Sequence, residues 1–536
     1  MSAEQAFDYV IAGGGTAGCV LANRLSADPA CRVLLLEAGG ADSHYLIHMP
    51  VGFAKMTAGP YTWGYRSVPQ RHGNGREILL PQARVLGGGG SINALVFTRG
   101  APSDFDRWEA EHGCTGWSFK DVQPYFLKCE DNDRLSKPWH GVGGPLGVSD
   151  LVNPHPLTKA FVRAGQEFGL PYSGDFNGAA QEGVGVYQTT TRGGRRCSAA
   201  VAYLRPARKR PNLTVKTGCT VLRLLVANGS AGGVEYVQNG GAPQKARAEA
   251  ETVVCAGAIG TPRLLMLSGL GPADELKKLG IEVAADLPGV GENLHDHCDI
   301  DIVYELRHSN SLDRYNKKHW ALWAGLQYVL FNSGPVTSNV AEGAAFSFHR
   351  DRPRGPAADF QFHFLPGAGA EAGVPPVPSG YGCTLNTYQV QPRSRGTVKL
   401  RSADPKEPPL IDPNYLAEAA DVEASVEALQ QAVAIMGQPS LAAHVKQPHH
   451  PPKAPATAAE CEAYIRANGR TSYHHCGTCR MGGSDDAPLD PQLRVRGVGR
   501  LRVADSSAMP QIISSNTNAT TFMIAEKAAD LIAAAS

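Results

Sequence analysis

A glycine pattern set between a buried strand and a helix constrains this chain more than any other feature. Residues 7–12 form a short apolar run typical of a buried parallel strand, and residues 19–25 have a helical composition. Between them stands Gly13-x-Gly15-x-x-Gly18, and a second apolar run, residues 32–36, ends at an acid. A strand, this glycine pattern, a helix and a second strand in that order predict a dinucleotide-binding βαβ unit.

Each glycine of the pattern has a separate physical task. Gly13 permits the tight turn, Gly15 lets the backbone approach a pyrophosphate, and Gly18 lets the helix pack closely on the strand. The phosphates then lie at the helix N-terminus, where unpaired N–H groups point outward. Glu37 follows Gly18 by 19 residues, near the spacing of about 20 expected for an acid that binds a ribose hydroxyl. The pattern alone leaves both NAD and FAD open.

Composition excludes several classes of protein. The 536 residues carry 51 Lys+Arg and 50 Asp+Glu, without the basic excess of a nucleic-acid binder. No apolar run reaches the roughly 18 residues of a membrane span, and the N-terminus lacks the pattern of a secretory signal. The 12 cysteines show no disulfide-framework spacing. We therefore expect a cytoplasmic protein, with peripheral attachment to the inner face of a membrane left open.

A second glycine-rich block, residues 84–100, contains four consecutive glycines, 87–90. Such a run is entropically costly to order, which favours a close approach of the backbone to a ligand. The block resembles the first signature of the glucose–methanol–choline (GMC) oxidoreductase family of FAD enzymes, and residues 257–271 resemble the second. Segments 287–297, 474–482 and 505–518 are similar to further family motifs in the same order. The resemblance covers most of the chain and is strongest to bacterial FAD-dependent alcohol dehydrogenases and choline dehydrogenases.

The resemblance implies an α/β fold with two domains. A Rossmann-like FAD-binding domain would be assembled from residues 1–155, 195–305 and 465–536. A substrate-binding domain, with an antiparallel sheet covered by helices, would comprise residues 156–194 and 306–464. The alternation of polar and apolar residues at 359–364 agrees with an antiparallel strand in the second domain.

The resemblance also implies a mechanism and a catalytic pair. His474 matches the family's catalytic base, and Asn518 matches the partner position where relatives carry His or Asn. His474 would accept the hydroxyl proton, Asn518 would hydrogen bond to the same oxygen, and hydride would pass to flavin N5. The sequence departs from the family at His475, where relatives commonly have proline, but alignment through residues 477–479 favours His474 as the base.

Further positions are implied as contacts of FAD, with simple core packing as a competing interpretation for Val221 and Ala256. The predicted cofactor-binding residues are Gly13, Gly15, Thr16, Ala17, Gly18, Glu37, Ala38, Arg84, Gly88, Asn93, Ala94, Val96, Val221, Ala256, Asp505, Asn518, Ala519 and Thr520. Some relatives attach FAD through a histidine that stands where this chain has Ile92, so we expect FAD to bind non-covalently. The His and Cys residues of segments 474–479 and 295–297 superficially resemble zinc ligands, but both segments are family motifs, and no metal is expected.

The predicted function is oxidation of a primary alcohol to an aldehyde, with electrons passed to a quinone or another acceptor. A choline dehydrogenase and an oxygen-using alcohol oxidase are alternatives within the family. A GMC-fold lyase or a light-driven flavoprotein is an alternative of another class. An NAD-dependent dehydrogenase is disfavoured, because it would not need the additional signatures. The predicted partners are a small alcohol and an electron acceptor, and the sequence does not indicate the oligomeric state.

Overall fold

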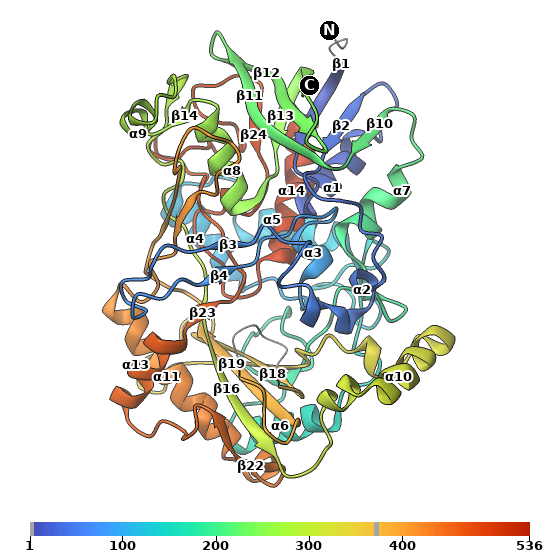
Figure 1. The fold of residues 1–536 in the computed structure, drawn as a ribbon, viewed down its shortest axis with the longest axis vertical. Coiled ribbons are helices and arrows are strands. Elements are labelled where there is room, and N and C mark those ends of the chain that lie inside the picture. The colour runs from blue at the N-terminus through green and yellow to red at the C-terminus, as the bar shows by residue number, and fades with distance from the viewer. Residues whose placement is uncertain (1–4, 369–374, 536) are drawn as a thin grey trace.

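The computed structural model describes residues 5–368 and 375–535. The molecule is elongated, and each half is built on one large sheet (Figure 1). The α/β fold with a second, antiparallel sheet is confirmed. Among the described residues, no helix is both long and apolar enough to cross a bilayer.

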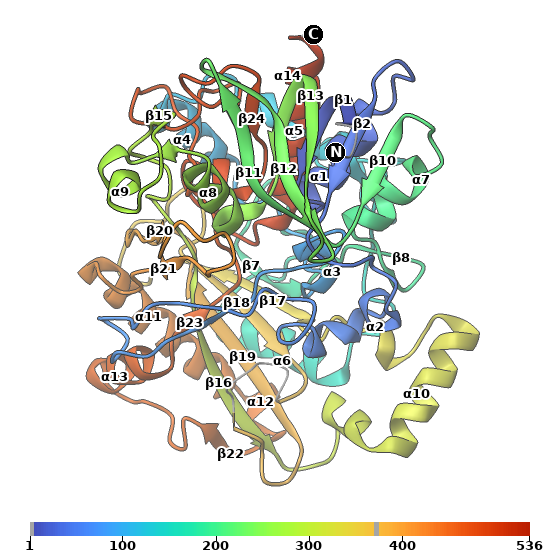
Figure 2. The same cartoon turned by 45° about the horizontal axis from the view of Figure 1, so that its top comes forward.

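The first sheet has seven strands in the order β10-β2-β1-β13-β12-β11, with β24 also paired to β13. The pairs of β1 with β2 and with β13 are parallel, whereas β11, β12 and β13 form an antiparallel meander. Figure 2 shows the strands side by side, from β10 at one edge to β11 at the other. The bounds are β1 Gln5–Ala12, β2 Val33–Leu36, β10 Leu213–Lys216, β11 Cys219–Ala227, β12 Ser230–Gln238, β13 Pro243–Val254 and β24 Leu501–Val503.

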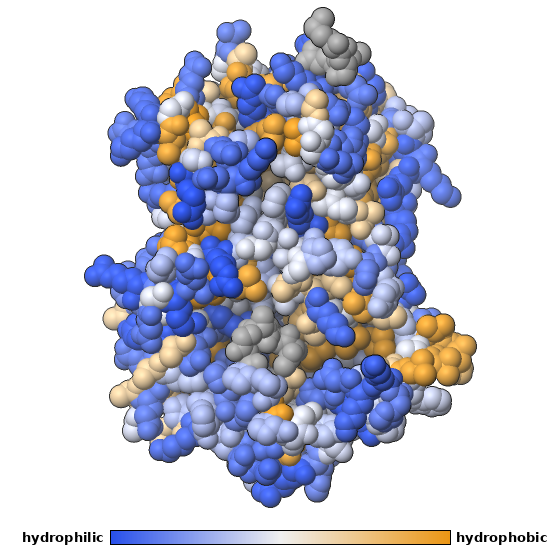
Figure 3. Space-filling view, viewed as in Figure 1, coloured by the Kyte–Doolittle hydropathy of each residue, from blue (hydrophilic) through white to orange (hydrophobic). Residues whose placement is uncertain are grey.

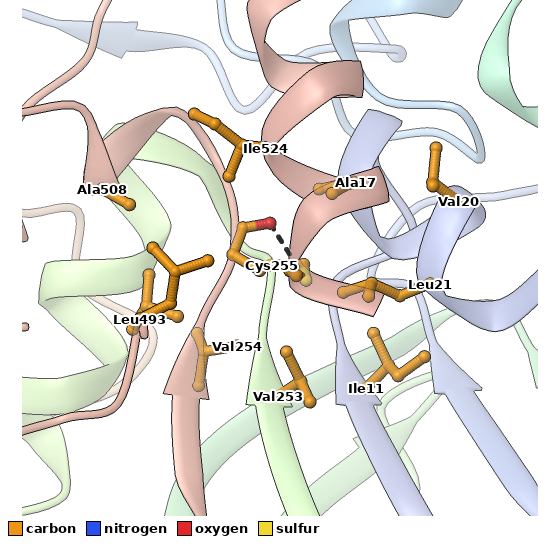
Figure 4. Close-up of a cluster of buried hydrophobic side chains, with 14 of the residues drawn as sticks. Ile11, Ala17, Val20, Leu21, Val253, Val254, Cys255, Leu493, Ala508 and Ile524 are labelled. Atoms are coloured by element: carbon orange, nitrogen blue, oxygen red, sulfur yellow. Dashed lines mark hydrogen bonds between the residues drawn. The ribbon is translucent and has the colours of Figure 1, made fainter. Parts of the chain in front are cut away.

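The predicted βαβ unit is present at the centre of this sheet. Helix α1, Thr16–Leu25, connects β1 to β2, and the C-terminal helix α14, Asn518–Ala533, packs against α1. Apolar side chains from the two central strands meet those of the helices in one core, where Ile11 and Val253 are fully buried (Figure 4). The carboxyl end of β1 is therefore held rigidly where the glycine pattern begins.

The second sheet is antiparallel, in the order β22-β16-β19-β18-β17-β7, and β23 also pairs with β16. Its central strands are buried throughout, which is typical of a sheet covered on both faces. The bounds are β7 Gly183–Val186, β16 Cys298–Leu306, β17 Gly343–Ser347, β18 Phe360–Leu365, β19 Gly382–Gln389, β22 Val445–His450 and β23 Arg470–Thr471.

Helices fill the space around the two sheets. Helix α5 packs on α14, and α11 packs on β19 of the second sheet. The longer helices are α4 Pro102–His112, α5 Phe119–Cys129, α6 Pro156–Glu167, α8 Gly257–Leu267, α10 Lys318–Phe331, α11 Ala419–Met436 and α13 Ala458–Asn468. Shorter helices are α2 Tyr45–His48, α3 Gly89–Ile92, α7 Arg205–Ala207, α9 Ala273–Lys278 and α12 Pro439–Ala442. Short strand pairs are β3 Tyr65–Arg66 with β4 Leu79–Leu80, β5 Glu130–Asn132 with β6 Leu146–Val148, β8 Thr191–Arg192 with β9 Arg195–Arg196, β14 Leu270–Gly271 with β15 Ala285–Asp286, and β20 Thr397–Lys399 with β21 Leu410–Asp412.

One predicted boundary needs adjustment. The predicted FAD-binding domain ran to residue 305, but β16 lies wholly in the second sheet, paired with β19 and β22. In β16, Asp299 and Asp301 alternate with Ile300 and Ile302, as in an antiparallel strand, although every residue of the strand is buried. The remaining division into domains stays a prediction.

Candidate active site

A cavity lies between the two sheets and receives residues from both. Gly13 and Glu37 line it from the carboxyl ends of β1 and β2, and Asp299 and His363 line it from β16 and β18. His474 lines the same cavity from the segment after β23. The glycine pattern and the candidate base therefore open onto one space.

The glycine-rich walls of the cavity are formed by backbone in close contact. Gly13 has φ +112°, and a Cβ there would lie 2.3 Å from the carbonyl oxygen of Cys255. Gly88, with φ +55°, would place a Cβ 2.6 Å from the Cα of Gly15. Only glycine fits either position without a shift of the backbone. The two glycine-rich segments thus meet, and Gly15 is the N-cap of α1.

Glu37 holds this loop in place while it faces the cavity. Its Oε2 accepts a hydrogen bond from the amide of Gly14 (2.8 Å), and its Oε1 accepts one from the amide of Gly39 (2.7 Å). Burial raises the pKa of Glu37, against the opposing effect of the two amides. A carboxylate oxygen can accept more than one hydrogen bond, so capacity remains for a hydroxyl in the cavity.

A network of hydrogen bonds fixes His474 at the other end. Its main-chain amide donates to Asp296 Oδ1 (2.8 Å). Its Nδ1 lies 2.9 Å from Nδ1 of His297, and its Nε2 lies 3.0 Å from Nδ2 of Asn516. His297 Nε2 lies 2.9 Å from the carbonyl oxygen of Val390. Every ring nitrogen of the two histidines has a partner.

The partners determine which nitrogen of His474 carries the proton. A carbonyl oxygen only accepts, so His297 Nε2 must donate to Val390, and the Nδ1 of neutral His297 accepts. His474 then donates from Nδ1 and keeps a lone pair on Nε2. The Asn516 amide nitrogen, a donor, faces that lone pair. Nε2 is therefore the basic nitrogen of His474.

The surroundings keep His474 neutral. Burial lowers its pKa well below the usual 6.5, and the neighbouring histidines His297, His363 and His475 lower it further. Burial likewise lowers the pKa of His297 to about 4 and that of His363 to about 3. A neutral imidazole with a lone pair directed along a cavity wall is suited to accept a proton.

Asn516, and not Asn518, lies against His474. Asn516 Oδ1 accepts from Thr98 Oγ1 (3.0 Å) and Gln361 Nε2 (2.9 Å), which directs its amide nitrogen to the histidine. Asn518 instead lies by the glycine pattern, where its Oδ1 accepts from Thr16 Oγ1 (3.0 Å). The expected pairing of His474 with Asn518 is therefore wrong. Asn518 begins helix α14, so its side chain follows the helix towards α1.

Family models for GMC oxidoreductase match the chain over residues 7–299 and 392–525. The alcohol dehydrogenase [acceptor] of Pseudomonas putida is 44% identical, over 98% of this chain and 95% of that one. The oxygen-dependent choline dehydrogenase of Sinorhizobium medicae is 42% identical over the same shares. The chain belongs to the GMC oxidoreductase family. Among solved structures, an FAD-dependent oxidoreductase of Chaetomium thermophilum is similar with a TM-score of 0.89, at 28% identity and 99% coverage of each chain.

Membership of the GMC family implies FAD, and the cavity walls fit that group. Glycine backbone, an acid beside the loop and the N-terminus of α1 face the same space, as the phosphates and ribose of a dinucleotide require. Ala256 is exposed, so core packing does not explain it. The predicted contacts that line the cavity are Gly13, Gly15, Thr16, Ala17, Glu37, Ala38, Gly88, Asn93, Ala94, Val96, Val221, Ala256, Asp505 and Asn518.

Four predicted contacts are not among the residues that line the cavity. A Cβ on Gly18 would lie 1.9 Å from the carbonyl oxygen of Gly13, so Gly18 allows helix and strand to pack. The guanidinium of Arg84 lies 4.8 Å from the ring centroid of Trp63. Ala519 and Thr520 are buried in the first turn of α14. Gly18, Ala519 and Thr520 therefore shape the cavity from behind its walls, whereas the exposed Arg84 packs on Trp63, which lines the cavity.

The sequence interpretation missed several residues of this GMC site. His297 was considered only as a superficial zinc ligand; within the described residues no group of three or more His, Cys, Asp or Glu side chains could hold a metal ion. Asp299, His363 and Asn386 line the cavity beside His474. His297 is the last residue of the 287–297 motif, and Asp299 follows it by two residues. That motif was therefore the signal that could have indicated both residues.

The buried histidines predict a pH-dependent stability. His295, His297, His363 and His474 all have pKa values below the ordinary 6.5 because they are buried. Below pH 6.5 the unfolded chain binds protons at these positions that the folded chain does not. The free energy of unfolding should therefore fall as the pH drops below about 6.5, by up to about 1.4 kcal/mol per pH unit for each histidine.

Urea unfolding at pH 7.5, 6.5 and 5.5 measures this slope. The His363→Gln variant provides the comparison, because it removes one of the four groups while glutamine can still donate to Tyr388, which lies 3.0 Å from His363 Nε2. The slope should decrease by about one proton in the variant. An equal slope in both proteins would contradict the assignment of His363 as neutral in the folded state.

Proposed function

We propose that this GMC oxidoreductase oxidises a primary alcohol to an aldehyde, with His474 as the base. The observation that carries the proposal is the lone pair of His474 Nε2, which the bond to His297 leaves free of a proton and which faces the cavity beside Asn516. Bound FAD would supply the acceptor for the hydride that leaves the carbinol carbon.

The residues around His474 each have a part in moving the hydroxyl proton. His474 Nε2 takes the proton, and the Asn516 amide donates to the alcohol oxygen as negative charge develops on it. The bond from His474 Nδ1 to His297 survives the transfer, because that nitrogen carries a proton before and after. Asp296 accepts from the main-chain amides of His474 and His297 and so fixes the two histidines relative to each other.

FAD would be held without a covalent bond. Ile92 lines the cavity at the position where some relatives carry a histidine linked to FAD, and an alkyl side chain cannot form that link. Acid precipitation of the holoenzyme should therefore release all of the flavin into the supernatant.

Polar groups of the cavity wall indicate whether the alcohol substrate is charged or uncharged. Asp299 brings a carboxylate to the cavity wall, where Arg470 lies 2.9 Å from it. Asn386 donates to Asp299 (3.3 Å), while its own buried Oδ1 has no hydrogen-bond partner. Arg470, which also pairs with Asp301, holds the carboxylate of Asp299 in an ion pair and leaves less of its charge to attract an ammonium group, which favours an uncharged alcohol. The carboxylate itself keeps choline oxidation as the second candidate.

Two isosteric alcohols separate these candidates. Choline and 3,3-dimethyl-1-butanol have the same shape, and only choline is charged. We expect kcat/KM to be at least about tenfold higher for the uncharged alcohol, because Asp299 is already paired with Arg470 and the ammonium of choline would be buried without a free carboxylate. A higher kcat/KM for choline would reject the uncharged substrate class in favour of the second candidate.

The electron acceptor is proposed to be a quinone or another carrier. One relative is named for an unspecified acceptor and another for oxygen. Turnover with a water-soluble quinone should exceed oxygen consumption, measured with an oxygen electrode under air without the quinone. Equal or faster turnover with oxygen would identify an oxidase instead.

A further inference from the structure

Helix α10 projects from the second half of the molecule with apolar side chains in contact with solvent. The helix stands apart at the edge of the fold (Figure 1), and Figure 3 shows hydrophobic atoms gathered there. Its exposed side chains are Leu322 (76%), Trp323 (60%), Leu326 (49%), Val329 (72%), Leu330 (60%) and Phe331 (72%). Six large apolar side chains on one exposed helix are unusual for a surface that stays in water.

Five of the exposed residues form one continuous face, and the sixth, Phe331, ends the helix. Leu322, Leu326 and Val329 follow the i, i+4, i+7 spacing of a helix stripe, and Trp323 and Leu330 lie beside it. The opposite side of the helix packs on the protein through Ala324 and Tyr328. An ordinary surface helix has its apolar stripe on the protein side and polar residues outside. Helix α10 is apolar on both sides.

The length of α10 indicates whether the helix could span a bilayer or lie in its interface. Fourteen residues span about 21 Å, at 1.5 Å per residue. A helix that crosses the hydrocarbon core needs about 30 Å. Helix α10 is therefore too short to span a bilayer, but long enough to lie in the plane of its interface with the apolar face inserted.

Positive charge lies at both ends of the helix. Lys317 and Lys318 are exposed at its start, and Arg314 lies 4.2 Å from the ring of Trp320. At the other end, a Cβ on Gly194 would lie 2.7 Å from the carbonyl oxygen of Asn332, which places the exposed Arg195 of β9 nearby. No Asp or Glu occurs between residues 314 and 341.

The positive charge at both ends of α10 favours a lipid surface over a second copy of the chain as the partner of its apolar face. Clusters of basic residues beside an inserted helix are attracted to anionic lipid headgroups. A second copy of the chain, docked symmetrically through the same face, would bring these like charges together. We propose that α10 is a membrane-docking helix, which lies in the interface of a bilayer that contains anionic lipid.

Docking through α10 would bring the cavity close to the bilayer. The buried side of α10 packs against Met49 and Val51, and the hydroxyl of Tyr328 donates to the carbonyl oxygen of His48 (3.4 Å). The same segment continues into the short helix Pro50–Lys55, whose Phe53 lines the cavity. The inference does not depend on the proposed function, because it rests on the surface alone.

Flotation of the purified holoenzyme with lipid vesicles tests the proposal. Vesicles of phosphatidylglycerol and phosphatidylcholine, mixed equally, should carry the protein to the top of a density gradient, and vesicles of phosphatidylcholine alone should carry much less. The triple variant Leu322→Gln/Leu326→Gln/Leu330→Gln should bind the anionic vesicles at least about tenfold more weakly. Val142→Gln, at another exposed apolar residue (68%), is the matched control and should bind like the unaltered protein.

A charge variant and two controls complete the test. Lys318→Glu/Arg195→Glu should lower binding to anionic vesicles by about tenfold or more, with a much smaller effect on neutral ones. The flavin absorbance of each variant confirms that it is folded, and light scattering without lipid gives its mass. Equal flotation of the triple variant and the Val142→Gln control would overturn the proposal. The proposal would also be overturned if the unaltered protein were a dimer, and the triple variant became a monomer that still bound vesicles as well as the unaltered protein.

Discussion

Replacing His474 with alanine is expected to leave FAD bound and to slow its reduction by an alcohol by about 10²–10⁴-fold. The variant removes the lone pair of Nε2, which faces the amide of Asn516 at the cavity wall. The cofactor walls at the glycine loop lie at the other end of the cavity and should be unaffected. Rapid mixing without oxygen, followed at the flavin absorbance, measures the rate directly.

His475→Ala is the matched control for this prediction. His475 also lines the cavity, but its Nδ1 contacts Gln82 Nε2 (3.3 Å) and its Nε2 lies 3.4 Å from Asp296 Oδ2. Neither nitrogen is placed beside Asn516, so its loss should have a much smaller effect on the reduction rate. Normal reduction in His474→Ala together with loss of reduction in His475→Ala would show that the base is the neighbouring residue.

Replacing Asn516 with alanine should slow flavin reduction by about 10²-fold at saturating alcohol. The reason is that an amide donor aimed at a developing oxyanion contributes on that order to the rate. Asn518→Ala removes a side chain that accepts from Thr16 at the glycine loop, so its main effect should be weaker retention of FAD. Reduction rates at saturating alcohol and the dissociation constant for FAD separate the two effects.

The paired variants distinguish the two asparagines clearly. If Asn518→Ala lowered the reduction rate more than Asn516→Ala, with FAD retained, the pairing seen in the structure would not be the catalytic one. Asn516→Asp serves as a further control, because it keeps the size of the side chain but replaces the donor with an acceptor. It should be at least as slow as the alanine variant.

Local patterns predicted the parts of the site that depend on local geometry. The glycine loop follows from residues 7–37, because a strand, a tight turn and a helix N-terminus are fixed by neighbours in the chain. Glu37 likewise lies where its spacing from Gly18 predicted, at the end of β2. These positions needed no knowledge of the rest of the fold.

The parts that failed depend on distant segments. Asn516 and Asn518 are two residues apart, and only the start of α14 decides which of them faces His474. His297 acts on a residue 177 positions away, which no local spacing reveals. The apolar residues of α10 are plain in the sequence, but their exposure arises because no described residue packs over that face.

The visible spectrum of the purified protein, recorded without oxygen before and after adding primary alcohols, tests the central claim most directly. We predict a flavin absorbance band that bleaches with at least one alcohol of the panel, which should include choline and 3,3-dimethyl-1-butanol. A flavin band that no alcohol bleaches would contradict alcohol oxidation and favour a lyase or a light-driven flavoprotein on the same fold. A protein that shows no flavin band even after FAD is added back would contradict the cofactor itself.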